Sequence, residues 1–145
     1  MKPVPALFIV DDNPADLGLA REALARCAYR GQISSAGDGV EAMAFLTRRE
    51  KFADAVRPDL VILDLNLPKK DGLAVLAGMK AHPELRRIPV VIFSTSQLAR
   101  DITRSYELGA NCYISKPGNL NEFFSTIKAI EEFWFGPVKL PPRGE

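Results

Sequence analysis

Charged side chains follow short apolar segments at three points in the sequence. Asp11 and Asp12 follow the first of these segments, and Asp64 follows another. Lys116 comes two residues after a third, weaker segment. If the segments are strands of one parallel sheet, their carboxyl ends meet at the edge where such sheets bind ligands. Three carboxylates and one ammonium would then share a single crevice.

Those residue types favour a particular chemistry. Carboxylates repel one another by roughly 4 kcal/mol for a pair 4 Å apart at an effective dielectric constant of 20. One lysine leaves the group net negative, and oxygen ligands with room for water suit Mg²⁺. A metal-bound carboxylate beside an ammonium is also a setting for an aspartyl phosphate, with a hydroxyl from Ser94, Thr95 or Ser96 bonding a further phosphoryl oxygen. We therefore expect a Mg²⁺ site capable of phosphoryl transfer.

The strands that would position these residues are mostly continuous apolar runs. Such runs are typical of strands buried on both faces of a parallel sheet. The candidates are Leu7–Val10, Gln32–Ala36, Leu60–Leu63, Val90–Phe93 and Cys112–Ile114. Helical segments separate them, which requires right-handed crossovers. The pattern predicts a doubly wound α/β domain of five strands and five helices.

The helical segments carry recognisable starts. Asn13 is a capping residue followed by proline at the first helical position, and Asp38 precedes a second helix. The expected helices run from Pro14 to about Ala28, onward from Asp38, over Leu73–Met79, over Leu98–Leu108 and over Asn119–Phe135. The inner face of the first should hold Leu17, Ala20 and Leu24. That of the second should hold Val40, Met43 and Ala44, with Leu46 near its edge. In the last, the apolar stripe is Leu120, Phe123, Ile127, Ile130 and Trp134.

Composition narrows the class of protein. The chain has 145 residues, enough for one domain, and its 19 basic and 18 acidic side chains give a net charge of +1. Without a basic excess, nucleic acid and anionic membranes are not expected as partners. Strongly apolar runs reach only five residues and the first ends at Asp11, so neither a membrane span nor a secretory signal is expected. Two cysteines favour a reducing, cytoplasmic location.

Taken together, the motifs resemble the receiver domain of two-component response regulators, the CheY-like family. The matching motifs are Asp11-Asp12, Asp64-x-Asn66-x-Pro68 with Asp71-Gly72, and Tyr113-x-x-Lys116-Pro117. The resemblance spans about residues 6–130. It implies a flavodoxin-like (βα)5 fold with strand order 2-1-3-4-5. Residues 1–135 would form the receiver domain and residues 136–145 a C-terminal tail, with no DNA-binding output domain.

The resemblance also implies a role for each residue of the crevice. Asp64 would be the phosphoacceptor. Asp12 would bind Mg²⁺ directly, Asp11 through water, and Asn66 through its backbone carbonyl. Lys116 would pair with the phosphoryl group.

Two further residues match the switch of this family. Ser94 takes the hydroxyl position, where the family more often has threonine. Tyr113 matches the aromatic residue that rotates inward when the hydroxyl moves toward phosphate. The Lys116–Pro117 peptide bond is expected to be cis.

The C-terminal segment suggests a subfamily and partners. Its aromatic residues, together with the long segment Thr47–Arg57, resemble single-domain regulators paired with phytochrome-type sensor kinases. The one histidine, His82, precedes a proline in a predicted loop, so the phosphoryl donor would be a sensor histidine kinase. Off the apolar stripe of the last helix lie Phe124, Phe133 and Phe135. We expect them to form a homodimer surface through this helix and the tail, unless Val138–Pro142 folds back over them.

Two alternatives remain open at this point. A phosphohydrolase of the haloacid-dehalogenase type also uses a nucleophilic aspartate at a strand end. That family places a second carboxylate two residues later, where this sequence has Asn66. The other alternative is a pseudo-receiver that binds partners without being phosphorylated.

Overall fold

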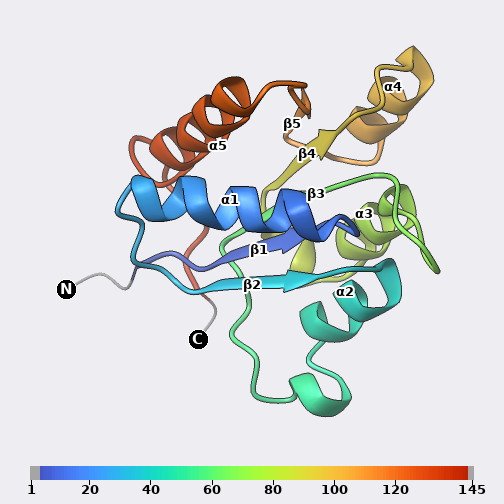
Figure 1. Ribbon diagram of the computed structural model, residues 1–145. Helices are drawn as coiled ribbons and strands as arrows, with labels where there is room; N and C mark the ends of the chain where they lie inside the picture. The colour runs from blue at the N-terminus through green and yellow to red at the C-terminus, as the bar shows by residue number, and fades with distance from the viewer. Residues whose placement is uncertain (1–3, 144–145) are drawn as a thin grey trace.

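Five parallel strands form one sheet with helices on both faces (Figure 1). The computed structural model describes residues 4–143. The strands lie in the order β2-β1-β3-β4-β5. Their bounds are β1 (Leu7–Val10), β2 (Ile33–Ala36), β3 (Leu60–Leu63), β4 (Val90–Ser94) and β5 (Cys112–Ser115). The predicted flavodoxin-like topology is confirmed.

The helices divide between the two faces. Helices α1 and α5 pack against each other on one face, whereas α2, α3 and α4 lie on the other (Figure 1). Their bounds are α1 (Pro14–Arg26), α2 (Gly39–Leu46), α3 (Gly72–Ala81), α4 (Ala99–Glu107) and α5 (Leu120–Trp134). Two short 3-10 helices, η1 (Glu50–Phe52) and η2 (Leu85–Arg87), lie in the connections that precede β3 and β4.

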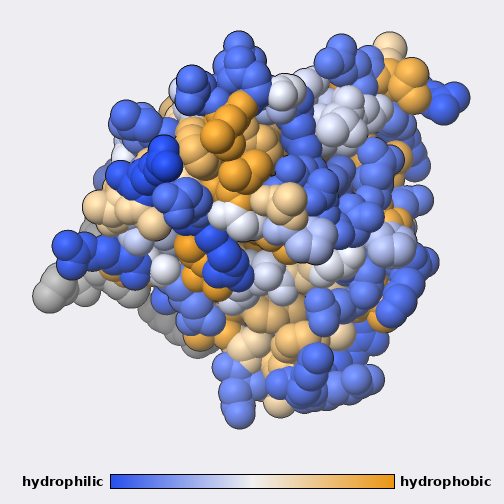
Figure 2. Space-filling model, viewed as in Figure 1, coloured by the Kyte–Doolittle hydropathy of each residue, from blue (hydrophilic) through white to orange (hydrophobic). Residues whose placement is uncertain are grey.

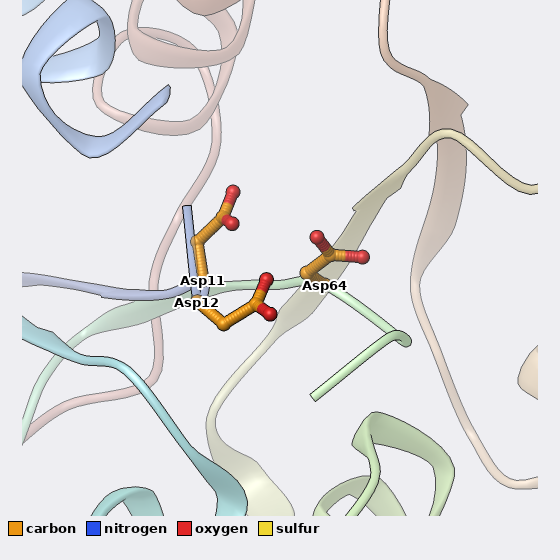
Figure 3. A group of neighbouring side chains, drawn as sticks. All are labelled: Asp11, Asp12 and Asp64. Atoms are coloured by element: carbon orange, nitrogen blue, oxygen red, sulfur yellow. The ribbon is translucent and has the colours of Figure 1, made fainter. Parts of the chain in front are cut away.

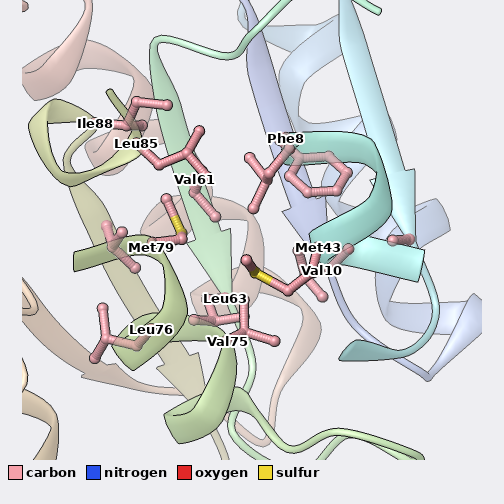
Figure 4. Packing of buried hydrophobic residues seen from close by; sticks show 14 of the residues in the cluster. Phe8, Val10, Met43, Val61, Leu63, Val75, Leu76, Met79, Leu85 and Ile88 are labelled. Atoms are coloured by element: carbon pink, nitrogen blue, oxygen red, sulfur yellow. The ribbon is translucent and has the colours of Figure 1, made fainter. Parts of the chain in front are cut away.

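Each face of the sheet has its own hydrophobic core. Successive strand residues point to opposite faces, so Phe8 and Val10 of β1 pack toward α2 and α3. Leu7 and Ile9 pack toward α1 and α5. Figure 4 shows the first core, where Met43 of α2 lies among side chains from β1, β3 and α3. The continuous apolar runs of the sequence therefore reflect burial on both faces.

The predicted helix starts are confirmed. The side chains of Asn13, Asp38 and Asn119 each accept a backbone N–H of the first helical turn. Helix α1 ends at Arg26, slightly before the predicted Ala28. Ala28 has a φ of 56°, in the left-handed region, which a continuing helix cannot accommodate.

The predicted inner face of α2 is wrong in part. Val40 is 53% exposed, whereas Leu46 is fully buried. The cause is a close approach at Gly39, where an added Cβ would lie 1.7 Å from the carbonyl oxygen of Lys70. Gly39 therefore faces inward, and the buried positions three, four and seven residues after it are Ala42, Met43 and Leu46.

The tail returns to the amino edge of the sheet. Arg143 bonds to Asp59, just before β3, and to the carbonyl of Val4. Phe135 stacks on Tyr29, and Arg26 lies over the ring of Phe124. The predicted aromatic surface is thus largely covered by neighbouring side chains.

Phe133 is the exception, because it remains 55% exposed. Leu120, the first residue of the predicted stripe, is also exposed, at 53%. Of the expected receiver and tail ranges, residues 1–3, 144 and 145 lie outside the described residues. Within residues 4–143, no helix has the length and apolar character needed to cross a membrane.

Candidate functional site

The strand register brings the predicted aspartates together. Val10 of β1 pairs with Leu63 of β3, so Asp11 and Asp64 leave the sheet at the same level. Figure 3 shows the side chains of Asp11, Asp12 and Asp64 at this edge. Carboxylate oxygens of the three lie within 4.8 Å of one another. Asp11 and Asp64 are buried, and Asp12 is exposed.

Lys116 reaches this group from the loop between β5 and α5. Its Nζ lies 2.6 Å from Asp11 Oδ2 and 3.0 Å from Asp64 Oδ2. Its backbone N–H donates to the carbonyl of Ser94, 2.8 Å away, which ties the loop to the end of β4. The side chain of Lys116 is only 5% exposed, so the ammonium is held almost entirely by protein groups.

Burial and the neighbouring carboxylates shift the pKa of Lys116 in opposite directions. Burial alone lowers the pKa of Lys116, but hydrogen bonds to three carboxylates outweigh it and raise the pKa above its ordinary value. The pKa of Asp11 is also raised, because burial outweighs the hydrogen bonds from Lys116 and from the N–H of Asn13. The lysine is therefore firmly charged, while its negative partner Asp11 is still incompletely compensated.

The carboxylates fit a divalent metal ion. Three hard oxygen donors lie close enough to share one ion, and the exposure of Asp12 leaves room for water ligands. Asn66 lies beside them, since its backbone N–H donates to Asp64 Oδ1 over 3.2 Å. The structure therefore contains an acidic site able to hold a metal ion.

The start of α3 is packed directly against Asp64. An added Cβ at Gly72 would lie 2.2 Å from the carbonyl oxygen of Asp64. The N–H of Gly72 donates to the carbonyl of Leu65, and Asp71 caps the helix through the N–H of Ala74. The loop from Asp64 to α3 thus folds tightly back on the strand end.

The two predicted switch residues lie farther along the same edge. Ser94 is fully buried at the end of β4, and its Oγ accepts the N–H of Ser96 over 3.3 Å. Tyr113 is half-buried, and its hydroxyl donates to the carbonyl of Ser96 over 2.7 Å. The ring therefore already lies inward, linked to Ser94 through Ser96.

One expectation about this edge is wrong. No cis peptide bond occurs among the described residues, so the Lys116–Pro117 bond is trans. The trans form is the intrinsically favoured one, by about 0.5–1 kcal/mol for a bond before proline. In this structure Lys116 reaches the carboxylates without the cis form.

Sequence reasoning missed one partner of Lys116. Asp16 Oδ2 lies 2.9 Å from Lys116 Nζ, a third ion pair with that lysine. In the sequence Asp16 is an ordinary acidic residue in the first turn of a helix, where acids are common. The available signal was its place on the first turn after Asp11 and Asp12, which brings it to the same edge of the sheet.

Comparisons with known proteins agree with this geometry. The family model described as response regulator receiver domain matches residues 7–128. The chain is 43% identical over 139 residues to response regulator Rcp1 of Synechocystis sp., a match covering 96% of this chain and 95% of Rcp1.

Solved structures are similar over nearly the whole chain. The phosphorylated cyanobacterial phytochrome response regulator RcpA has a TM-score of 0.92 and 50% identity, covering 95% of this chain and 99% of that one. The Mn²⁺-bound form of Rcp1 has a TM-score of 0.91 and 43% identity, with the same coverage. The chain therefore belongs to the response regulator receiver domain family and is a phosphoacceptor signalling protein rather than a phosphohydrolase.

Proposed function

We propose that Asp64 accepts a phosphoryl group from a sensor histidine kinase in a Mg²⁺-dependent reaction. The observation that carries this proposal is the buried carboxylate of Asp64, which has Lys116 Nζ 3.0 Å away and two further aspartates within reach of a shared ion. A nucleophile, a fixed cation and a metal site are thus present at one strand end.

The transfer is a displacement at phosphorus. A carboxylate oxygen of Asp64 forms the new P–O bond as the P–N bond of the phosphohistidine breaks. The electron pair of that bond stays on the imidazole, which leaves as a neutral ring when its other nitrogen carries a proton. Lys116 donates to an oxygen of the transferred group and neutralises part of its charge.

Four residues would hold the metal ion. Asp12 and Asp64 would bind through carboxylate oxygens, Asp11 through water, and Asn66 through its backbone carbonyl. When bound, Mg²⁺ would neutralise charge on the phosphoryl oxygens. The similarity to Rcp1, which has been crystallised with Mn²⁺, supports a hard divalent ion at this site.

The proposed kinase is of the phytochrome type. The relative RcpA is a phytochrome response regulator, and 50% identity over 95% of this chain supports the same pairing. The donor histidine would come from the kinase, because His82 lies at the end of α3 and its Nδ1 accepts the N–H groups of Glu84 and Leu85.

Phosphorylation would be read out through the loop between β4 and α4. If Ser94 Oγ turns to donate to a phosphoryl oxygen, it releases the N–H of Ser96. The carbonyl of Ser96 holds the hydroxyl of Tyr113, so the loop and the ring would shift together. The added charge of about −1.5 to −2 would thereby bias the surface around α4 and β5.

The partner at the neighbouring surface would be a second copy of this chain. A groove of about 520 Å³ runs between the edge strand β5 and α5, and none of its lining residues is charged. Phe133 stands exposed at its rim, and Cys112, Ile114 and Ala129 line it. Figure 2 shows apolar side chains exposed over α5 among hydrophilic neighbours. An uncharged, apolar surface is suited to meet its own copy around a twofold axis.

Phosphoryl labelling tests the central proposal. Wild type incubated with a phytochrome-type kinase, ATP and Mg²⁺ should become labelled, and Asp64→Asn should not. Asp54→Asn removes an exposed carboxylate far from the site and should be labelled like wild type. Equal labelling of wild type and Asp64→Asn would refute the assignment. An absence of labelling in wild type, together with no response to beryllofluoride and Mg²⁺, would favour the pseudo-receiver.

Light scattering tests the dimer. Phe133→Ala should shift the protein toward monomer, as should truncation after Ile130. Val40→Ala, an equally exposed apolar residue on α2, should not. A monomeric wild type at high concentration, with and without beryllofluoride, would contradict this part of the proposal.

A further inference from the structure

Every N–H donor of the Lys116 ammonium is already used. The three donors bond to Asp11, Asp16 and Asp64 at 2.6, 2.9 and 3.0 Å. Two of these carboxylates belong to the metal and phosphoryl site. Asp16 is not part of that site, so its contact with Lys116 needs a separate explanation.

Asp16 lies on the lysine side of the site. Among the described residues, the carboxylates close enough to share one ion are Asp11, Asp12 and Asp64, without Asp16. The side chain of Asp16 is 23% exposed, whereas those of Asp11 and Asp64 are 6% and 7% exposed. Of the three partners of Lys116, Asp16 can most readily exchange the ammonium for water.

We propose that Asp16 is a positioning residue that competes with the phosphoryl group for Lys116. In the unphosphorylated protein it restrains the ammonium, and on phosphorylation it releases one N–H for the phosphoryl oxygen. This inference rests on the proposed phosphoryl transfer to Asp64.

The release of Asp16 follows from the cost of the alternatives. A phosphoryl oxygen can gain an N–H from Lys116 only if an existing bond breaks. Breaking the bond to Asp11 would leave a buried carboxylate without its cation, which has a high cost in free energy. Asp64 keeps its bond through Oδ2 when its other oxygen, Oδ1, forms the new P–O bond. The bond to Asp16 is therefore the one exchanged, and its carboxylate turns to water.

A competitor of this kind should affect the rate at which the aspartyl phosphate forms but not the rate at which it is hydrolysed. The Asp16 contact stabilises the unphosphorylated state but is absent once Lys116 has turned to the phosphoryl group. Its loss should therefore speed formation of the aspartyl phosphate. Hydrolysis starts from the state in which the contact is already broken, so its rate should be unchanged.

Phosphoramidate is the appropriate donor for the test, because it is a small molecule and needs no contact with a kinase. An oxygen of Asp64 attacks the phosphorus of phosphoramidate whose nitrogen is protonated. The P–N bond breaks, its electron pair stays on nitrogen, and the nitrogen leaves as neutral ammonia. With Mg²⁺ present, Asp16→Asn should be phosphorylated about fivefold faster than wild type, the effect of one charge-assisted hydrogen bond reduced by partial exposure. Asp16→Glu keeps the carboxylate within reach of the lysine and should restore the wild-type rate.

Glu22→Gln is the matched control. It removes one exposed carboxylate from the same helix, away from Lys116, and should leave both rates unchanged. A second readout uses the unphosphorylated protein. In calorimetric titrations with Mg²⁺, Asp12→Asn should weaken binding far more than Asp16→Asn does, because Asp16 is not a ligand.

The outcomes separate the inference from the function on which it rests. If wild type is labelled on Asp64 but Asp16→Asn is equal or slower, Asp16 is not a competitor and the inference fails alone. Equal changes in formation and hydrolysis would overturn it as well. If wild type accepts no phosphoryl group at all, the proposed function fails and the inference with it.

Discussion

The two edges of the sheet both hold an aspartate against a cation, but the charges are balanced at one edge only. At the amino edge, Asp59 accepts bonds from Arg143 and from the N–H of Ala6, so one carboxylate meets one guanidinium. At the carboxyl edge, several carboxylates face the single ammonium of Lys116. They are Asp11, Asp12, Asp16 and Asp64.

This difference separates a structural ion pair from a reactive one. A balanced pair ties the tail to the domain and has nothing further to bind. An excess of carboxylates stores repulsion that a divalent metal ion can relieve, and the ion together with Lys116 can then offset the charge of a phosphoryl group.

Removal of Lys116 should have the largest effect. Lys116→Met leaves buried carboxylates without their cation and should lower the free energy of unfolding by about 3–5 kcal/mol at neutral pH. Added Mg²⁺ should restore part of the loss. Urea denaturation with EDTA and then with Mg²⁺ measures both values. A variant as stable as wild type in EDTA would show that the excess negative charge does not affect the free energy of unfolding.

Metal removal should have the next largest effect. Saturation with Mg²⁺ at a hundred times its Kd should raise the free energy of unfolding by about 2.7 kcal/mol. Asp12→Asn should need much more Mg²⁺ for the same gain. Thermal melts across a Mg²⁺ titration test this, and an identical response in both proteins would place the ion elsewhere.

The balanced edge should respond to mutation but not to metal. Asp59→Ala leaves the N–H of Ala6 without its acceptor and the guanidinium of Arg143 without its carboxylate partner, and it should lower the free energy of unfolding by about 2 kcal/mol. Its Mg²⁺-dependent gain should equal that of wild type. A smaller gain would mean that the two edges are coupled through the sheet.

The smallest effect concerns pH at the amino edge. Burial raises the pKa of Tyr29 from 10 to about 12, and its hydroxyl donates to the carbonyl of Pro5. Between these pKa values the unfolded chain loses the phenolic proton while the folded one keeps it. Stability is therefore lost as pH rises through this window and is unaffected below it.

Comparison with Tyr29→Phe isolates this contribution from other alkaline titrations. Between pH 9 and 11 wild type should lose more stability than the variant, by about 0.5 kcal/mol or less because the group is partly exposed. Melting curves at each pH provide the measurement. Parallel losses in the two proteins would show that the ring is freely solvated.

The site could be predicted because topology alone places most of it. Asp11 and Asp64 follow strands that pair in parallel, and Lys116 follows another strand of the same sheet. Their proximity needs no knowledge of side-chain packing, since the carboxyl ends of parallel strands share one edge. The strand bounds and the helix caps could also be predicted, because apolar runs and capping residues are features of the local sequence.

The remaining features depend on contacts between distant parts of the chain. Asp16 meets Lys116 across 100 positions, and Arg143 meets Asp59 across 84. The inner face of α2 depends on the approach of Gly39 to the backbone of Lys70. Local periodicity contains none of these contacts, which is why it predicts the wrong face for Val40 and shows Asp16 only as an acid in the first turn of a helix.

The contact between Gly72 and the carbonyl of Asp64 limits how this sequence can diversify. A single added methyl group at position 72 would displace the backbone that carries the phosphoacceptor. The capping residue beside it, Asp71, could be exchanged for another capping residue at small cost. Two adjacent positions of one loop therefore differ in mutational tolerance, one constrained by signalling chemistry and the other only by folding.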